Sequence, residues 1–143
     1  MHPLLSALYE AAGQLARGLA AVLPPTEAKW ARAVRARRGV RARWTAWARA
    51  SRDPARPLLW VHAPSVGEGL QARPVLELAR ARRRELQVVY SFFSPSAVAF
   101  ARGLVERGTA DHADYLPFDT RGDAAALIGA LAPRALVFAK LDV

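Results

Sequence analysis

The sequence predicts an α/β fold, a Rossmann-like parallel sheet preceded by a helical N-terminal extension. From residue 58 onward, short apolar runs alternate with longer stretches of helical periodicity. The run 86–92 is apolar almost throughout, which is typical of a strand buried on both faces of a parallel sheet. The chain has 143 residues and is 52% hydrophobic, so it can form a domain with a real core. It has no cysteine, which excludes disulfides and thiolate metal sites.

Residues 1–57 are expected to form a helical, basic extension in front of the sheet domain at 58–143. Within the extension, apolar residues recur at spacings of three and four from 3 to 23, which predicts an amphipathic helix. A helix of this length could roughly cross a bilayer, but Glu10 and Arg17 would be costly at its centre. We expect the helix either to lie in the plane of a membrane or to pack on its own domain.

A second helix is expected from Thr26 or Glu27 toward Ser51, and Gly39 is a point where it can split. Most of the net charge of +9 comes from this region, where three tryptophans are interleaved among the arginines. Such a composition suits the surface of an anionic membrane. The other interpretation is a solvated arginine face with the tryptophans packed inward. No nucleic-acid-binding motif is present, so nucleic acid is not an expected partner.

The sheet domain is expected to alternate four strands with three helices after a linker at 53–57. Its strands are predicted at 58–62, 86–92, 113–118 and 135–140, and its helices at 70–84, from Ser94 to about 106, and at 121–131. The inward positions of the first of these helices are expected to be Leu70, Val75, Leu76, Leu78 and Ala79.

The turn after the first strand carries the candidate chemistry, because ligands of parallel sheets bind at the carboxyl ends of the strands. Glu68 in this turn is either a catalytic or binding carboxylate or a first-turn glutamate stabilised by the helix dipole. Ser65 and Gly67 can offer a hydroxyl and a backbone N–H to an anionic substrate, or they can simply form the turn. His62 is a weaker catalytic candidate, and its plainer interpretation is a buried, hydrogen-bonded histidine.

The stretch 62–68, His-Ala-Pro-Ser-Val-Gly-Glu, resembles the signature of the Kdo transferases, which add 3-deoxy-D-manno-octulosonic acid (Kdo) to lipid A precursors. Residues 93–96, 115–119 and 133–137 are also similar to segments of that family. The resemblance implies the N-terminal, acceptor-side half of a GT-B glycosyltransferase. It implies Glu68 as the general base.

The same resemblance implies substrate contacts at the two turns and at the end of the fourth strand, from Ser65, Gly67, Ser94, Ser96, Lys140 and Asp142. Family members continue the fourth strand with Glu-Thr-Glu-Leu-Trp-Pro. Here Lys140 replaces the first glutamate with the opposite charge, and Asp142 stands in for the second. This departure leaves a different substrate open. Neither a metal nor a cofactor is expected.

The implied partners are a lipid A precursor as acceptor, CMP-Kdo as donor and an anionic membrane surface. The donor is expected to bind mainly to a C-terminal domain beyond residue 143, so this chain alone is expected to be inactive. The expected location is peripheral, on the cytoplasmic face of the bacterial inner membrane. Two alternatives remain open: a non-catalytic module that binds anionic lipid, and a related glycosyltransferase with a different nucleotide-sugar donor.

Overall fold

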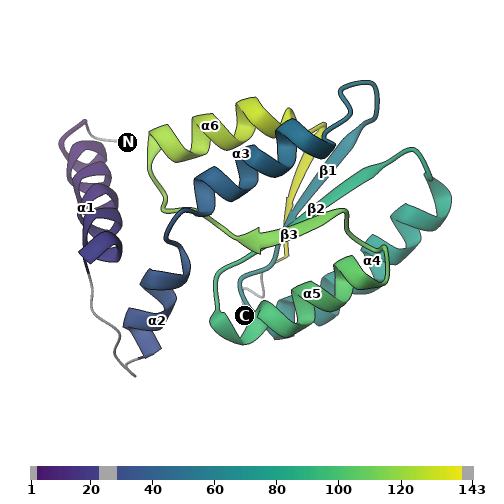
Figure 1. Cartoon of the computed structure of the whole chain (residues 1–143), viewed down its shortest axis with the longest axis horizontal. Coiled ribbons are helices and arrows are strands. Elements are labelled where there is room, and N and C mark those ends of the chain that lie inside the picture. The colour runs from purple at the N-terminus through teal and green to yellow at the C-terminus, as the bar shows by residue number, and fades with distance from the viewer. Residues whose placement is uncertain (1–2, 23–28, 140–143) are drawn as a thin grey trace.

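The centre of the molecule is a four-stranded sheet in which all strands are parallel, in the order β3-β2-β1-β4 (Figure 1). This computed structural model describes residues 3–22 and 29–139. The predicted α/β class is confirmed. The strands are β1 (Leu58–His62), β2 (Gln87–Phe92), β3 (His112–Tyr115) and β4 (Ala135–Phe138).

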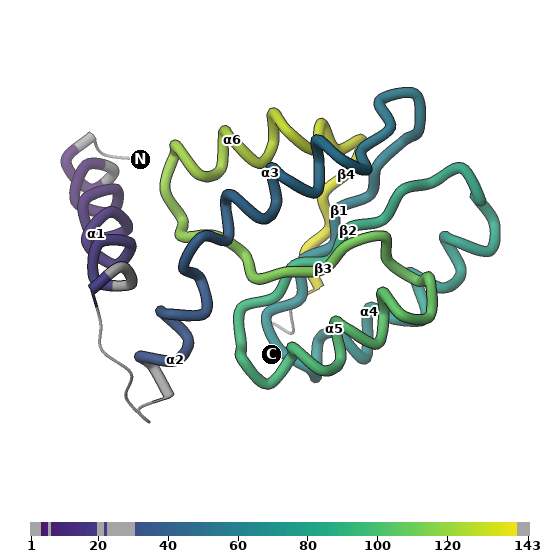
Figure 2. The backbone as a smooth tube through the Cα atoms, in the orientation of Figure 1, coloured from purple at the N-terminus to yellow at the C-terminus, as the bar shows by residue number. Residues whose placement is uncertain are grey.

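Helices cover both faces of the sheet, with α3 and α6 on one side and α4 and α5 on the other (Figure 1). The path of the chain in Figure 2 shows that α1 and α2 lie beside this layered body. None of the helices in the described ranges is long and apolar enough to cross a membrane. Their bounds are α1 (Pro3–Val22), α2 (Lys29–Ala36), α3 (Val40–Ser51), α4 (Val66–Arg82), α5 (Val98–Glu106) and α6 (Arg121–Leu131), with a short 3-10 helix, η1 (Pro95–Ala97), before α5.

Burial differs sharply across the sheet. Every residue of β2 is buried, because β1 and β3 flank it and helices cover both of its faces. By contrast, all four residues of β4 are exposed at the edge of the sheet. The apolar run that predicts β2 is therefore explained by its central position.

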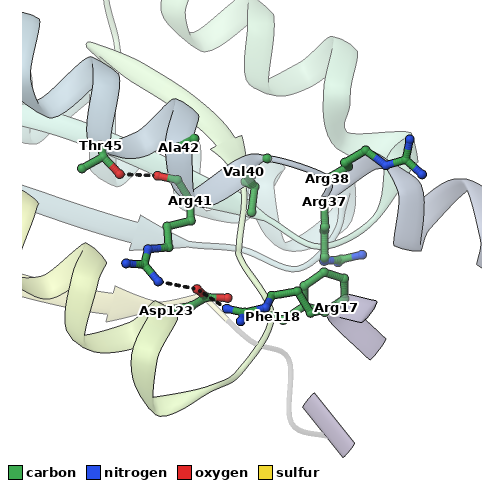
Figure 3. Close-up of a pocket in the computed structure, with 10 residues that line it drawn as sticks. Arg17, Arg37, Arg38, Val40, Arg41, Ala42, Thr45, Phe118 and Asp123 are labelled. Carbon is green, nitrogen blue, oxygen red and sulfur yellow. Dashed lines mark hydrogen bonds and ion pairs between the residues drawn. The ribbon is translucent and has the colours of Figure 1, made fainter. Parts of the chain in front are cut away.

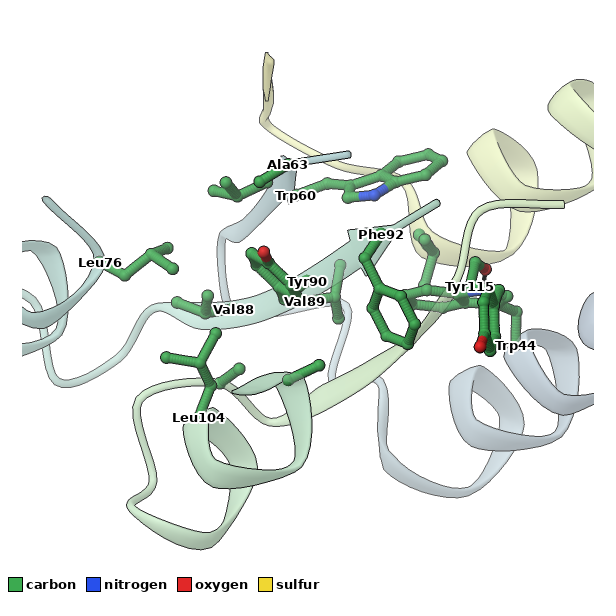
Figure 4. Close-up of a cluster of buried hydrophobic side chains, with 14 of the residues drawn as sticks. Trp44, Trp60, Ala63, Leu76, Val88, Val89, Tyr90, Phe92, Leu104 and Tyr115 are labelled. Carbon is green, nitrogen blue, oxygen red and sulfur yellow. Dashed lines mark hydrogen bonds between the residues drawn. The ribbon is translucent and has the colours of Figure 1, made fainter. Parts of the chain in front are cut away.

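The core of the molecule is rich in aromatic side chains (Figure 4). Trp44 of α3 is fully buried, and its ring centroid lies 6.1 Å from that of Trp60 on β1. Its indole N–H donates to the carbonyl of Tyr115 at 2.9 Å. Phe92 packs against Tyr115, with 4.5 Å between ring centroids. Trp44 is thus a core residue, so it cannot lie on a membrane surface.

Part of the basic character is also structural. Arg43 forms a two-pronged ion pair with Asp114, at 2.6 and 2.9 Å. Arg52 donates to the carbonyl of Leu131 at 2.7 Å and to the side-chain oxygen of Gln87 at 2.9 Å. These arginines join the segment before residue 57 to the sheet. The division of the chain at residue 57 stays a prediction.

The element boundaries correct several expectations. One expectation is confirmed: the second predicted helix is split at Gly39, whose φ of 67° is the left-handed conformation that glycine tolerates best. The helix expected at 70–84 begins at Val66, because Ser65 is its extended N-cap residue, and it ends at Arg82. The third strand ends at Tyr115, before Pro117, and the fourth ends at Phe138. The expected start of the second helix and the end of the fourth strand lie partly outside the described residues.

The inward face of α4 also differs from expectation. Leu70, Val75 and Leu78 are exposed, whereas the buried residues of this helix are Gly69, Ala72 and Leu76. The helix therefore rests on the sheet mainly through small side chains. Such packing leaves its larger apolar residues outside.

Candidate active site

Two turns meet at the carboxyl edge of the sheet. The carbonyl oxygen of Pro64, after β1, accepts the N–H groups of Phe93 and Ser94, after β2, at 3.0 and 2.8 Å. These bonds bring the Ser65–Glu68 segment next to the Ser94–Ser96 segment, as the parallel register of β1 and β2 requires. The end of β4 joins the same edge, because Ala139 donates its N–H to the carbonyl of His62 at 2.8 Å. Lys140 and Asp142 lie outside the described residues.

Glu68 lies in the first turn of α4 and is half-buried. The hydroxyl of Ser65, the N-cap residue, donates to its carboxylate. This hydrogen bond is the main cause that lowers the pKa of Glu68, and nearby backbone N–H groups, including that of Ser65, act in the same direction. Glu68 is therefore ionised at neutral pH. The arrangement also resembles a capping box, so this carboxylate has a local structural role as well.

The floor beneath Glu68 is tightly packed. A Cβ atom at Gly69 would lie 2.6 Å from the hydroxyl of Tyr90 and 2.6 Å from a ring carbon of Phe100, so a larger residue would have to displace these rings. The Tyr90 hydroxyl is buried and has no hydrogen-bond partner among the described residues. Burial, with the charge of Glu68 as a second cause, raises the pKa of Tyr90 to about 12. No signal in the sequence singles out Tyr90, because a tyrosine in an apolar run looks like an ordinary core residue.

The serines of the second turn are engaged with each other. The Oγ atom of Ser94 accepts the N–H of Ser96 at 3.3 Å and lies 2.8 Å from the Ser96 hydroxyl. Ser94 is the N-cap of η1, and Pro95 follows at its first position. Gly67, in the first turn, is exposed. Both turns thus lie at the predicted edge, while their contact with substrate stays a prediction.

His62 is a buried residue of the sheet, as its plainer interpretation held. Its Nδ1 atom lies 2.9 Å from the hydroxyl of Ser91, which also accepts the indole N–H of Trp60 at 2.8 Å. Burial lowers the pKa of His62, so the ring is neutral at pH 7. The one signal for Ser91 in the sequence is a polar residue inside the apolar second strand.

An apolar cavity of about 210 Å³ opens beside this histidine, between α6, the end of β1 and the edge strand β4. The residues that line it include Trp60, His62, Phe118, Ile128, Leu136 and Phe138. Within 3–22 and 29–139, no three His, Cys, Asp or Glu side chains gather closely enough to hold a metal ion.

Comparison with known protein families gave a match to most of the chain. Residues 32–143 match the family described as 3-deoxy-D-manno-octulosonic-acid transferase (kdotransferase). A search of curated proteins found no match, and neither did a search of solved structures. The family consists of membrane-associated bacterial glycosyltransferases that use a sugar donor and a lipid acceptor. Because the match covers most of its length, the chain belongs to the Kdo transferase family.

Proposed function

We propose that this chain is the acceptor-side part of a glycosyltransferase that moves Kdo from CMP-Kdo to a lipid A precursor, with Glu68 as the general base. The observation that carries the proposal is an ionised carboxylate in the first turn of α4, at the carboxyl edge of β1. Ser65, Gly67, Ser94 and Ser96 would contact the acceptor from the two adjoining turns.

The proposed sugar transfer requires a group that accepts a proton from the acceptor hydroxyl. As the bond between Kdo and its CMP leaving group breaks, the acceptor hydroxyl attacks the sugar carbon and loses its proton. A carboxylate within hydrogen-bond reach can accept that proton, which typically contributes a factor of about 10² to 10⁴ in rate. Glu68 would release the Ser65 hydroxyl and accept the acceptor's O–H in its place. The turn would then hold the acceptor oxygen in line with the donor.

The N-terminal helix supports a membrane setting. The large apolar side chains of α1, such as Leu8 and Leu15, are 67% and 66% exposed, while its polar side faces the protein. Glu10 accepts the N–H of Arg121 at 2.9 Å, and the hydroxyl of Tyr9 donates to Asp119 at 2.5 Å. An apolar face turned outward suits a helix lying in a bilayer surface. We propose a peripheral location on the cytoplasmic face of the inner membrane, where lipid A precursors would be at hand.

A mass-spectrometric transfer assay tests the proposal. The protein that joins this chain to its donor-binding domain receives CMP-Kdo and a tetraacylated lipid A precursor. We expect Glu68→Gln to lower the rate of Kdo transfer by about 10² to 10⁴. It should leave thermal stability nearly unchanged, because glutamine also serves in a capping box. Glu77→Gln, an exposed change on the same helix, is the matched control and should keep full activity.

A second variant identifies the base by its titration. The Ser65 hydroxyl lowers the pKa of Glu68, so Ser65→Ala should raise that pKa. The acidic limb of the pH–rate profile should then move to higher pH. An unchanged limb in an active, folded Ser65→Ala enzyme would show that another group is the base. Under this proposal the donor binds mainly to a separate domain, so the 143-residue chain assayed by itself should transfer no Kdo.

The outward apolar face of α1 also favours a second candidate, a non-catalytic module that binds anionic lipid. In that case anionic vesicles would bind the chain, but no variant at Glu68 would change any transfer rate. A third candidate, a different nucleotide-sugar donor, is separated by a donor screen on the same acceptor.

A further inference from the structure

A second cavity, of about 360 Å³, lies where α1, the turn between α2 and α3, and α6 come together. Four arginines and one aspartate line it, so its wall carries more positive than negative charge: Arg17, Arg37, Arg38, Arg41 and Asp123. Figure 3 shows Arg17 and Arg41 both reaching Asp123, from two different helices.

The ion pairs in this cavity are loose. Arg17 lies 3.3 Å and Arg41 lies 3.6 Å from the same oxygen of Asp123, whereas strong charge-assisted bonds measure about 2.7–2.9 Å. The Asp123 side chain is only 3% exposed, but the two arginine side chains are 47% and 53% exposed. Two half-exposed guanidinium groups thus share one buried carboxylate. They retain donors that can bind an incoming anion.

Neighbouring groups favour an anion with an apolar attachment. Gly39, the N-cap residue of α3, has no side chain to cap the first turn, and the N-terminus of a helix favours negative charge. Arg37 adds a buried positive charge; it is tied to the carbonyls of Ala33 and Phe93 at 2.7 and 2.8 Å. Val40 and Phe118 supply apolar wall on the same cavity.

We propose that this cavity binds a terminal phosphate group, gripped by Arg17 and Arg41 in competition with Asp123. The planar guanidinium fork matches phosphate oxygens two at a time, which is why arginine serves phosphate sites so often. Because Arg17 comes from α1, the site couples the position of that helix to the bound phosphate. The phosphate can belong to a membrane lipid or be free in solution. Only the lipid source rests on the membrane contact proposed for α1.

The test measures binding of soluble dihexanoyl phosphatidic acid and of inorganic phosphate by calorimetry, using the whole chain. Arg17→Gln and Arg41→Gln should each weaken phosphatidic acid binding at least tenfold. Arg102→Gln removes the same charge from an exposed position on α5 and should weaken it less than twofold. Asp123→Asn should strengthen binding, because it removes the competing carboxylate. Its charge-matched control is Glu106→Gln, also exposed on α5.

Vesicle flotation separates the two sources. Phosphatidylcholine vesicles carry either phosphatidic acid or phosphatidylglycerol, adjusted to equal surface charge. A preference for phosphatidic acid that Arg17→Gln and Arg41→Gln abolish supports a lipid phosphate. The same variant pattern with inorganic phosphate, but no vesicle preference, supports a free phosphate. Equal losses in all three arginine variants, or no phosphate binding at all, would overturn the site.

These binding measurements do not depend on the proposed transferase activity. Phosphate binding needs neither the donor nor Glu68, so a loss of Kdo transfer leaves the site standing if its variant pattern holds. Thermal unfolding of each variant guards against misfolding. Should Asp123→Asn fold poorly, Arg41→Lys keeps the charge but loses the fork, and it should still weaken phosphatidic acid binding.

Discussion

Helices α1 and α3 are both amphipathic, but they are buried in opposite senses. Helix α3 turns Val40, Trp44 and Ala48 toward the sheet and leaves arginines outside. Helix α1 meets the protein through polar groups, Glu10 and Arg17, and leaves leucines outside. The fold itself therefore accounts for the apolar face of α3. The apolar face of α1 has no partner among the described residues, and a bilayer surface is the partner that we propose.

The largest expected effect is the loss of stability when a buried side chain of α3 is removed. Trp44→Ala removes a fully buried indole and its hydrogen bond to Tyr115, and it should cost about 3–5 kcal/mol of the free energy of unfolding. Leu15→Ala in α1 should change that free energy by less than about 0.5 kcal/mol, because the side chain is already exposed. Urea titration measures both. Similar losses in the two variants would erase the distinction between the helices.

Changes to the exposed leucines of α1 should weaken membrane binding and leave stability unchanged. Leu8→Ala removes an exposed leucine whose full burial in a bilayer is worth about 1.5–3 kcal/mol. Binding to anionic vesicles should therefore weaken about tenfold or more, with stability unchanged. Val75→Ala, an exposed apolar residue on α4, is the control. Equal weakening by the two changes would argue that α1 is not the membrane face.

A smaller gain in stability, and not a loss, is expected from a change at Tyr90, which lies under the candidate active-site turn. The Tyr90 hydroxyl is buried without a partner in the described structure, and such a group costs about 1–3 kcal/mol. Tyr90→Phe should therefore raise the free energy of unfolding by about 1 kcal/mol. A clear loss of stability would reveal a hydrogen bond to that hydroxyl, with Glu68 as the nearest charged candidate.

The smallest expected effect is a dependence of stability on pH that arises from two histidines in the strands of the sheet. Burial lowers the pKa of both His62 and His112 below the usual 6.5. Protonation then favours the unfolded chain, so stability is full above pH 6.5 and falls as the pH drops toward the folded-state pKa values. Urea titrations at pH 7.5 and 5.5 should show this loss, and His112→Phe should reduce it. A loss of the same size in that variant would exclude His112 as a source.

Much of the sheet domain was predictable because its signals are local. Three local signals each identify an element or a turn within a few residues. They are the apolar run of β2, the motif after β1 and the proline at the first position of η1. The adjacency of the Glu68 turn and the Ser94 turn also followed, since neighbouring parallel strands end at one edge.

The rest depends on contacts between distant parts of the chain. Gly67 and Gly69 look like turn residues, yet α4 starts at Val66 and needs Gly69 to approach Tyr90. Asp123 meets Arg17 across more than a hundred residues, so spacing alone carries no sign of their pairing. The same holds for the polar docking of α1, which hydrophobic periodicity would place the other way round.

We propose that Glu68 belongs to an enzyme that transfers Kdo to a lipid A precursor, and a competition between donors is the sharpest test of this role. The protein with its donor-binding domain is given the precursor and an equal mixture of CMP-Kdo and other nucleotide sugars, and the lipid product is identified by mass spectrometry. We predict that the product carries Kdo alone and that Glu68→Gln forms almost none. A product carrying another sugar, or Kdo transfer that survives in Glu68→Gln, would contradict the account.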